Sequence, residues 1–540
     1  MIDGLKDKHR QAIIDILSAN ERVQRVVLFG SRAMGTFTTT SDVDLALFGD
    51  ELTITDQARL GAKIERLPMA QQVDLLLYET IDNEKLRAHI KKHGIEWFRR
   101  DWGMSAGWPM VPLRELTINL DARRIPVKES DRKPGPYPYY GASGIVDFVE
   151  GYLFEGEYLL IAEDGENLRT RQLPIAFMAT GKFWVNNHAH IVIGNEKADT
   201  RFLMYALQNT DVSGYLTGAV MPKLTQANLN RIPLPCPAVD VQQAIVSNLK
   251  TLDDKIELNR QINQTLEEMA QAIFKSWFVD FEPVKAKIEA KTNGQDPERA
   301  AMGAISGKTD AELDHISPDQ LAQLRATAAL FPDELIGSEL GAIPKGWGVS
   351  TIGVEFIVTM GQSPPGHTYN ENEEGTPFFQ GRRDFKWRYP VNRVFCTAPK
   401  RFAQKGDTLL SVRAPVGDVN KAATICCIGR GLAALRHKSG CEAYTYYTLK
   451  KLEQYFNNFD TEGTVFGSIN QKDLKDIKTI RPDAKNLKEF SRLIGGFDKQ
   501  ILNNENQISS LTQLRDTLLP QLLSGEITVK GSESVIKEGI

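Results

Sequence analysis

A glycine-serine turn and a pair of aspartates near the start of the chain have the types and spacing of a phosphate-transfer site. The turn is Gly30-Ser31-Arg32, and Asp42 and Asp44 follow it in the segment SDVDL. Residues two apart on a strand point to the same face, so the two carboxylates would act together. Their oxygens suit Mg²⁺, which takes one or two carboxylates plus substrate phosphates, and a turn after a strand offers backbone N–H groups to a triphosphate. With Asp74 as a third carboxylate, the set predicts in-line nucleotidyl transfer.

The elements that must hold these residues are three short apolar strands. Residues 25–31, 42–48 and 72–78 are runs of apolar side chains, and helical patterns flank them at residues 7–19 and 56–67. Strands that alternate with helices predict a small α/β domain. We assign residues 1–104 to it.

This segment closely resembles the minimal nucleotidyltransferases of the polymerase-β superfamily. The family pattern is GSRARG, then SDxDL and a later Asp; the resemblance covers about residues 10–98, with Met34 where the family often has a basic residue. It implies ATP or another NTP as substrate. It also implies Asp42, Asp44 and Asp74 as Mg²⁺ ligands, with Asp74 as the acceptor-activating base, and Gly30, Ser31 and Arg32 as the phosphate site.

The composition is that of a globular protein with several domains. The 540 residues correspond to three or four domains. Hydrophobic residues make up 41% and charged residues 25%, which excludes a mainly disordered or fibrous chain. No run approaches the length of about 18 apolar residues that a membrane span needs. The five cysteines have no CxxC spacing, which fits free thiols in the cytoplasm, and a net charge of -4 requires any nucleic-acid surface to be a local patch.

A repeat at an offset of 245 residues divides the remainder of the chain into two similar halves. KLTQANLNRI at residues 223–232 aligns with SINQKDLKDI at residues 468–477, and Gly107-Trp108 and Gly346-Trp347 open the two copies. Each copy combines a Gly/Pro/aromatic globule with a long helix, which predicts a pseudo-twofold array. The expected parts are α+β domains at residues 105–238 and 343–483, helices at residues 239–282 and 484–530, a linker at residues 283–342 and a tail at residues 531–540.

Both long helices carry apolar residues at alternating spacings of three and four, which predicts a coiled coil. In the first helix the stripe includes Met269, and its rhythm breaks at Asn259; the equivalent position in the second helix is Asn504. Antiparallel helices related by a pseudo-dyad bring equivalent residues together at their centres. We therefore expect Asn259 and Asn504 to hydrogen-bond to each other and to set the register. The alternative is that each helix packs only on its own domain.

The two globules have the residue types of DNA-binding loops, in which basic, aromatic and polar side chains contact base edges. Residues 345–482 hold 20 Lys+Arg and 13 Asp+Glu, whereas residues 109–235 hold 13 and 14. Charge alone therefore favours DNA binding by the second globule. Each candidate base-reading residue has the alternative of a structural role or a phosphate contact; the candidates are Lys182, Trp184, Asn186 and His188 in the first globule and Arg382, Arg383, Lys386, Arg413 and Arg430 in the second.

Several longer strings resemble the specificity subunit of type I restriction-modification systems. They include TGKFWVNNHAHIV at residues 180–192, GDTLLSVRAPVGDVN at residues 406–420 and LRDTLLPQLLSGEI at residues 514–527, and the match spans about residues 107–529. The resemblance implies two target recognition domains, each reading one part of a double-stranded DNA site, and two spacer helices in an antiparallel coiled coil. It implies two methyltransferase subunits that use AdoMet, translocase/nuclease subunits, and a role in phage defence.

We therefore predict a multidomain α/β and α+β protein of the cytoplasm, with no membrane association. It would be a DNA-recognition subunit without catalytic residues of its own, fused to a nucleotidyltransferase domain that transfers AMP or another nucleotide to protein or RNA. A separate HEPN-type toxin is one candidate acceptor. Two alternatives are a chain that is primarily a nucleotidyltransferase targeted by its C-terminal region, and an N-terminal domain that is an inactive regulatory fold. The intact set of three aspartates favours an active site.

Overall fold

The computed structural model describes the chain except for residues 1–4, 6, 21, 39–40, 50–51, 66, 68, 70, 82, 100–107, 219, 454–455, 457–466, 530, 533–535 and 537–540. Two compact units are built mainly from Met1–Leu249 with Asp516–Glu538 and from Lys250–Arg515. Both long helices are continuous across this division, so each unit contains one end of each helix. Within the described part of the chain, no helix is long and apolar enough to cross a membrane.

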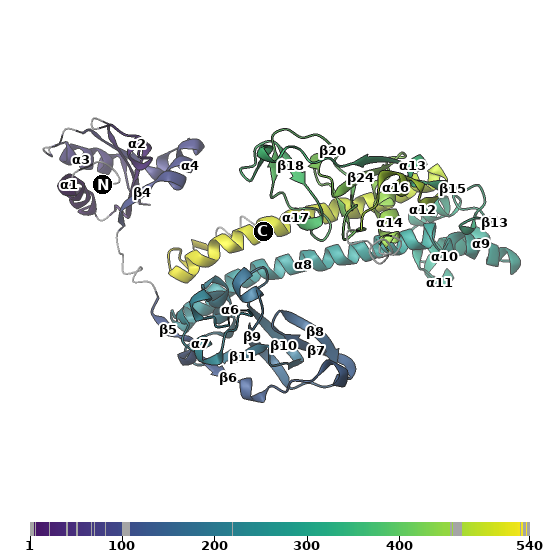
Figure 1. Cartoon of the computed structure of the whole chain (residues 1–540), viewed down its shortest axis with the longest axis horizontal. Coiled ribbons are helices and arrows are strands. Elements are labelled where there is room, and N and C mark those ends of the chain that lie inside the picture. Colours follow the sequence, from purple (N-terminus) through teal and green to yellow (C-terminus); the bar gives the residue numbers. More distant parts are fainter. Residues whose placement is uncertain are drawn as a thin grey trace. The chain divides into compact units, whose positions relative to one another are not determined.

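The N-terminal domain is a four-stranded sheet with helices on both faces (Figure 1). The strand order is β3-β2-β1-β4, with β2 and β3 parallel and the other neighbours antiparallel. Alternate strand residues are buried in two cores, one under α1 and α3 and one that includes Ile90 of α4, which confirms the predicted α/β fold. The elements are α1 (Asp7–Ser18), β1 (Arg25–Phe29), α2 (Gly30–Ala33), β2 (Val43–Phe48), α3 (Ile54–Ile64), β3 (Val73–Leu77), η1 (Tyr78–Thr80), α4 (Glu84–His93) and β4 (Ile95–Arg99).

The globule predicted at residues 105–238, named the first recognition domain after the resemblance, is built on a six-stranded sheet of order β6-β11-β9-β10-β7-β8. Strand β9 pairs antiparallel with both β10 and β11, and its residues from Leu159 to Ala162 are buried. Gly107, expected to open this domain, lies outside the described residues. The elements are β5 (Met110–Pro112), η2 (Leu113–Glu115), β6 (Thr117–Asn119), η3 (Asp121–Arg123), η4 (Glu129–Asp131), β7 (Pro134–Gly141), β8 (Gly144–Val149), β9 (Phe154–Ala162), α5 (Asn167–Thr170), β10 (Ala176–Val185), β11 (Ala189–Gly194), α6 (Thr200–Asn209), η5 (Ser213–Tyr215), α7 (Gln226–Leu229) and β12 (Pro233–Pro235).

The globule predicted at residues 343–483, named the second recognition domain, combines a four-stranded sheet, β16-β24-β21-β22, with a five-stranded sheet, β17-β19-β18-β23-β20. The elements are β15 (Gly348–Thr351), α13 (Ile352–Glu355), β16 (Phe356–Met360), η6 (Gly366–Thr368), β17 (Tyr369–Asn370), β18 (Thr376–Phe379), η7 (Arg382–Asp384), β19 (Phe395–Cys396), β20 (Phe402–Ala403), β21 (Thr408–Ser411), β22 (Val419–Lys421), β23 (Cys426–Ile428), β24 (Leu432–His437), α14 (Glu442–Lys451), α16 (Gln471–Asp476) and β25 (Lys478–Arg481). Both recognition domains are α+β, as predicted.

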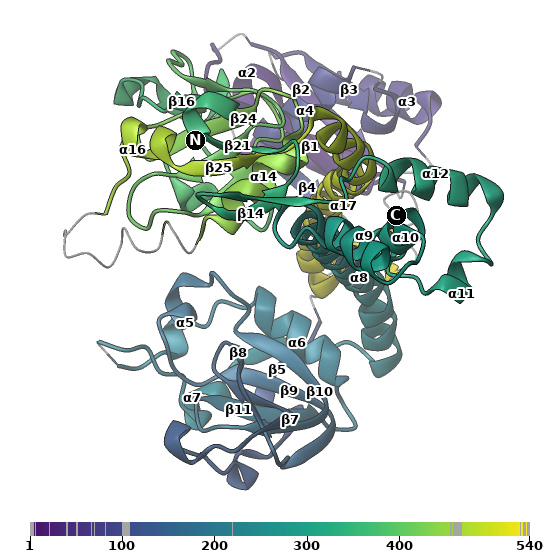
Figure 2. The ribbon, with the colours of Figure 1, turned by 90° about the vertical axis from the view of Figure 1, so that its right-hand side faces the viewer.

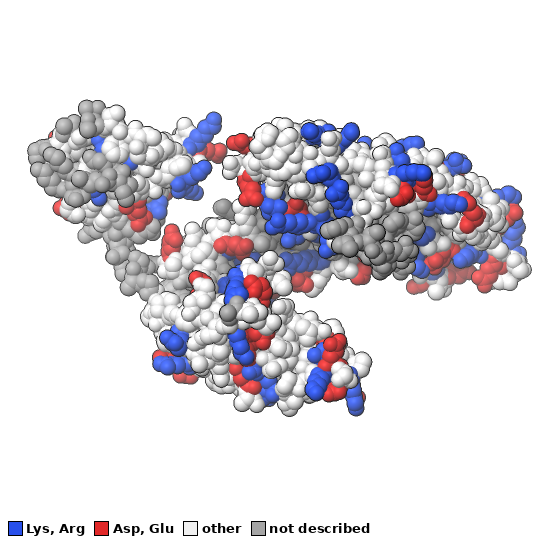
Figure 3. All heavy atoms as spheres, in the orientation of Figure 1, with Lys and Arg blue, Asp and Glu red and all other residues white. Residues whose placement is uncertain are grey.

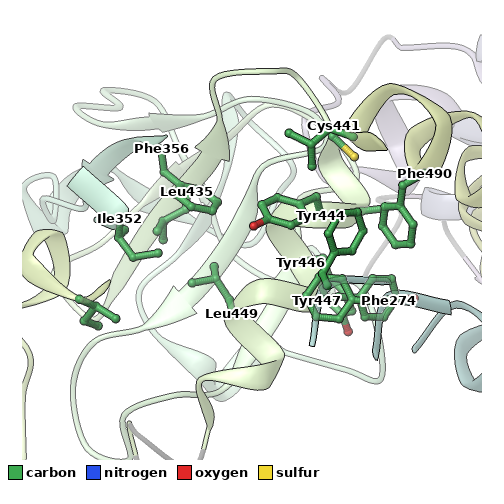
Figure 4. Close-up of a cluster of buried hydrophobic side chains, with 14 of the residues drawn as sticks. Phe274, Ile352, Phe356, Leu435, Cys441, Tyr444, Tyr446, Tyr447, Leu449 and Phe490 are labelled. Carbon is green, nitrogen blue, oxygen red and sulfur yellow. The ribbon is translucent and has the colours of Figure 1, made fainter. Parts of the chain in front are cut away.

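An aromatic core joins the second recognition domain to both long helices. These are α8 (Val239–Phe278) and α17 (Ala484–Ser524). Figure 4 shows Tyr444 and Tyr447 of α14 beside Phe274 of α8 and Phe490 of α17. Ring centroids of Phe274 lie 5.9 Å from Tyr444 and 5.8 Å from Tyr447. Burying a large side chain contributes about 1.5–3 kcal/mol, so this cluster holds the domain firmly on the helix pair.

Hydrogen bonds between the two long helices show that they run antiparallel. Arg515 Nη1 donates to Asp253 at 2.9 Å, and Asn259 Nδ2 donates to Gln507 at 2.7 Å. Asn263 Nδ2 donates to Glu505 at 2.8 Å. Residue numbers therefore rise along α8 as they fall along α17, which confirms the antiparallel coiled coil.

The partners of the two central asparagines differ from those we expected. Both are buried in the seam, but Asn259 bonds to Gln507, and Asn504 Nδ2 donates to Asn263 Oδ1 at 2.8 Å. This pairing places the pseudo-dyad near Gln261, half a helical turn beyond Asn259, so equivalent asparagines do not meet. The expected mutual pair is wrong by about one turn.

The seam of α8 also departs from the predicted apolar stripe. Met269 is 46% exposed, whereas Asn263 and Glu267 are 1% and 3% exposed. A pattern of apolar residues could not predict this face of α8, because the residues buried on it are polar. Their burial is stable because each has a hydrogen-bonding or charged partner.

Residues 283–342, predicted to be a linker with at most short helices, are instead folded around a core of their own. Figures 1 and 2 show their helices gathered beside the carboxyl end of α8. Ala301, Met302, Leu313 and Ala328 form a small core, and Phe331 packs edge-on against Trp277 of α8 at 5.0 Å. A high charge content therefore indicated solvated helix faces rather than a flexible chain. The elements are α9 (Glu282–Thr292), α10 (Pro297–Ser306), α11 (Asp310–Leu313), α12 (Pro318–Ala328), β13 (Leu335–Ser338) and β14 (Gly341–Pro344).

Candidate functional sites

At the junction of β1 and α2, the backbone of Gly30 lies against an aspartate of the neighbouring strand β2. Gly30 has a φ of +73°, and a Cβ built on it would lie 2.3 Å from Asp44 Oδ2. Any other residue would be strained by the positive φ and would collide with this carboxylate. Glycine at this position therefore permits the close approach of a backbone turn and an acidic side chain.

The predicted aspartates lie on adjacent strands beside this turn. Asp44 on β2 is in register with Asp74 on the parallel strand β3, and Asp42 lies two residues before Asp44. Asp42 and Asp74 are exposed, and Asp44 is half-buried. Burial raises the pKa of Asp44, the charges of Asp74 and Asp42 raise it further, and Arg32 opposes them. An excess of carboxylates that repel one another is the electrostatic setting in which a cation binds well.

The three carboxylates do not form a preassembled three-ligand cluster. Among the described residues, no three Asp, Glu, His or Cys side chains come close enough to ligate one metal ion. Magnesium usually takes one or two protein carboxylates and completes its shell with substrate phosphates and water. The donor chemistry of Asp42 and Asp44 beside the glycine backbone therefore fits a metal that binds together with a nucleotide.

The position of Arg32 corrects its expected role as a phosphate ligand. Its side chain is fully buried. Its Nη2 donates to Ser41 O at 2.6 Å, and its Nε donates to Ser41 O and Asp42 O at 3.0 and 3.1 Å. The guanidinium therefore ties the turn to the backbone just before β2. Arg32 therefore holds the backbone of Asp42 in place from a buried position.

Two of the four candidates in the first recognition domain have structural roles. Trp184 Nε1 donates to Ile125 O at 2.7 Å. Asn186 is 7% exposed, and its Oδ1 accepts from His188 N at 2.8 Å. These hydrogen bonds favour the alternative of a structural role for both side chains, and their assignment as base readers stays a prediction.

The other two candidates of the first domain are accessible. The side chain of Lys182 is 41% exposed and lies over the ring of Tyr152. The side chain of His188 is 52% exposed, and its Nδ1 lies 2.8 Å from Asp164 Oδ2. Lys182 and His188 remain candidates for DNA contact.

Exposed basic residues of the second recognition domain meet where three loops adjoin. Gly431 N donates to Gln380 O at 3.1 Å, and Val412 N donates to Gly431 O at 2.9 Å. These bonds join the segments that carry three of the candidate arginines. Figure 3 shows Lys and Arg side chains on the visible face of this domain. All five candidates are exposed: Arg382, Arg383, Lys386, Arg413 and Arg430.

A buried ion network under these loops was missed by sequence reasoning. Arg388 is fully buried and forms ion pairs with Glu267 of α8 and Asp498 of α17. Lys450 contacts Glu267 at 2.9 Å, and Lys421 contacts Asp498 at 2.8 Å. Arg388 stands among exposed basic residues in the string RRDFKWRYP, so no local pattern marks it as the buried one.

Comparison with known proteins gives matches to both parts of the chain. Residues 106–268 match the family described as type I restriction modification DNA specificity domain, and residues 11–102 match the family described as polymerase beta nucleotidyltransferase. The type I restriction enzyme HindI specificity subunit of Haemophilus influenzae is 31% identical over 413 residues, which cover 69% of this chain and 84% of that protein.

Two solved structures are also similar. The S subunit of a type I restriction-modification system from M. genitalium has 15% identity and a TM-score of 0.48, and the match covers 79% of this chain and 98% of that one. A tri-AMPylated HEPN toxin in complex with MNT antitoxin from Shewanella oneidensis has 19% identity and a TM-score of 0.15, covering 18% of this chain and 76% of the matched chain.

Proposed function

The chain belongs to the specificity subunits of type I restriction enzymes, and from this premise we propose that it reads a two-part double-stranded DNA site. Each recognition domain would read one part, and the antiparallel helix pair would fix the spacing between them. Two methyltransferase subunits would bind AdoMet and modify the site. Translocase/nuclease subunits would join them in the restriction complex that acts against phage DNA.

The observation that carries this proposal is the loop cluster of the second recognition domain. Exposed arginines converge on one end of its sheets, and the folded core behind them is anchored to both helices through Arg388. Such an arrangement can hold base-reading side chains rigidly while the helices set their distance from the other domain. Rigid support of the reading groups is what discrimination between bases requires.

The test is methylation by the full chain together with its methyltransferase subunits. We expect AdoMet-dependent methylation at one bipartite sequence, mapped by sequencing the modified DNA. Replacing residues 343–483 with the corresponding domain of a relative should change only one half of that sequence. A replacement that alters both halves or neither would contradict the assignment of one domain to each half.

We further propose that the N-terminal domain is an active nucleotidyltransferase. Asp42 and Asp44 would hold Mg²⁺ together with the phosphates of ATP or another NTP, and the Gly30-Ser31 backbone would contact those phosphates. The metal would stabilise charge on the transferring phosphate. Asp74 would accept the proton of the attacking acceptor group as that group bonds to the α-phosphorus, and the α–β phosphoanhydride bond would break to release pyrophosphate. The acceptor would be a protein or RNA, and a separate HEPN toxin is a candidate.

The corresponding experiment is transfer of radioactive label from ATP in the presence of Mg²⁺. We expect the chain or a co-purified partner to become labelled, and Asp42→Asn or Asp44→Asn to abolish labelling. Asp15→Asn, an exposed aspartate of α1 in the same domain, serves as a matched control. Absence of both ATP binding and labelling in the unaltered protein would favour an inactive regulatory domain.

A chain that is primarily a nucleotidyltransferase is the second candidate function, supported by the same three aspartates. It predicts labelling without sequence-specific methylation when the methyltransferase subunits are added. The two assays together therefore separate the alternatives.

A further inference from the structure

The two recognition domains share a hydrogen-bonding pattern that the 245-residue offset does not reveal. In the first domain, Asn186 N donates to Tyr140 O and Glu163 N donates to His188 O. In the second, Gly429 N donates to Phe379 O and Val412 N donates to Gly431 O. In the first domain these bonds join the turn between β10 and β11 to the end of β7 and to the residue after β9. In the second domain they join the turn between β23 and β24 to the end of β18 and to the residue after β21.

Further bonds extend the equivalence to the loop that follows. Leu224 N donates to Glu163 O, and Ile469 N donates to Val412 O. An isolated antiparallel β-bridge pairs the backbones of Asp164 and Lys223, and an equivalent β-bridge pairs those of Arg413 and Ser468. The strands also agree, because Ala189 pairs with Ala162 as Leu432 pairs with Ser411.

This shared framework places different side chains at two equivalent positions. The second residue after the strand is Asp164 after β9 and Arg413 after β21. The middle residue of the three-residue turn is Asn187 in one domain and Arg430 in the other. Asn187, Arg413 and Arg430 are exposed, and the Asp164 side chain is 22% exposed. Sequence reasoning selected both arginines but neither of their counterparts, because the local offset here is not 245.

The chemistry of these side chains points to different bases. An arginine fork donates two hydrogen bonds to O6 and N7 of guanine, an asparagine amide pairs with N6 and N7 of adenine, and a carboxylate accepts from N4 of cytosine. An acidic group on a DNA-facing loop also needs a compensating cation. Lys223 Nζ supplies this cation, 3.2 Å from Oε1 of the adjacent Glu163. His188 Nδ1 lies at hydrogen-bonding distance, 2.8 Å, from Asp164 Oδ2.

We propose that positions 164 and 187 in the first domain, and 413 and 430 in the second, are the base-reading pairs of this subunit. The second domain reads guanine through Arg413 and Arg430, whereas the first reads cytosine and adenine through Asp164 and Asn187. This assignment rests on the DNA-reading function proposed above and adds its residues and base classes.

The experiment uses the full chain with its methyltransferase subunits and the bipartite site mapped for the unaltered complex. Binding is measured on that site and on duplexes that change one base pair at a time, at several salt concentrations. Arg413→Ala and Arg430→Ala should each weaken binding to the cognate site by about 10- to 100-fold. Each should also lose discrimination at one guanine of the second half while leaving the first half unchanged.

Substitutions in the first domain give the reciprocal result. Asn187→Ala and Asp164→Ala should relax one adenine and one cytosine position of the first half only.

Lys405→Ala is the matched control for the arginine variants of the second domain, because this exposed lysine precedes β21 and Arg413 follows the other end of the same strand. We expect it to leave discrimination unchanged.

Arg413→Lys and Arg430→Lys separate base reading from phosphate contact. Lysine keeps the charge but lacks the planar fork, so discrimination should fall while the salt dependence stays. Weakening that is equal for every sequence, with a shallower salt dependence in the alanine variants, would show phosphate contacts and overturn the proposal. Unchanged binding would also overturn it. Absence of sequence-specific methylation by the unaltered complex would instead reject the proposed function itself.

Discussion

Replacing Arg388 with methionine tests whether the buried ion network holds the second recognition domain on the helices. Arg388 is fully buried, its partners Glu267 and Asp498 have side chains that are 4% and 13% exposed, and its guanidinium lies 3.9 Å from the ring centre of Tyr446. Burial lowers the pKa of Arg388, but Asp498, two tyrosines and Glu267 raise it by more, so it stays charged. Methionine has a similar length and removes the charge.

The size of the effect follows from what the substitution leaves behind. Removing one partner of a buried ion pair costs about 3–5 kcal/mol, because the remaining charge is desolvated and unpaired. In the variant, Glu267 retains its ion pair with Lys450, and Asp498 retains its ion pair with Lys421. We therefore expect the lower end of that range, about 3 kcal/mol, which corresponds to roughly a 100-fold change in an opening equilibrium.

Hydrogen exchange of the full chain measures this locally, because exchange reports the opening of separate cooperative regions. Peptides from α14 and from residues 486–498 should exchange about 100-fold faster in the variant, while peptides from β9 and β10 should be unchanged. Lys345→Met is the control: its ion pair with Glu334 has side chains 62% and 54% exposed, so at most about 1 kcal/mol is expected. An Arg388→Met effect no larger than this control would refute the reasoning.

Three further outcomes are expected. Gly30→Ala should abolish nucleotidyl transfer, whereas Gly35→Ala should not. Both glycines have a φ of +73°, but nothing lies within 4 Å of a Cβ built on Gly35. Equal labelling by the two variants would contradict the site geometry. Asn504→Leu should lower the free energy of unfolding by about 1–3 kcal/mol by leaving Asn263 Oδ1 without its donor. Replacing Asn263 with leucine as well should not restore this stability, because Glu505 then loses the amide that donates to it. The double variant should blur discrimination between DNA sites of different spacer length, measured by methylation. Burial raises the pKa of Glu267, but Arg388 and Lys450 lower it below its usual value. The stabilisation from ionised Glu267 is therefore complete above about pH 4.5, and it is lost as the pH falls through the lower pKa of the folded state. Hydrogen exchange of α14 should rise in acid, and it should rise less steeply in Glu267→Gln.

Where contacts are local or repeat with strand and helix geometry, the sequence was enough to predict them. The strand period places Asp42 and Asp44 on one face, and the parallel pairing of β2 and β3 puts Asp74 beside Asp44. Residue patterns also predicted the family of the N-terminal domain, the family of the remainder of the chain, and the antiparallel coiled coil. These features depend on neighbours within a few residues or on repeats that are visible in one dimension.

The partners of individual side chains depended on tertiary structure. Arg32 and Arg388 carry the same side chain as Arg413, yet the first two are buried among backbone carbonyls or carboxylates and the third is exposed. Similarly, the partner of Asn504 on α8 is Asn263, about one helical turn beyond the expected Asn259. Burial of a charge is decided by which distant groups arrive beside it and whether they compensate its lost hydration. That information is not carried by the residue or its sequence neighbours, so it became available only when the fold had brought the segments together.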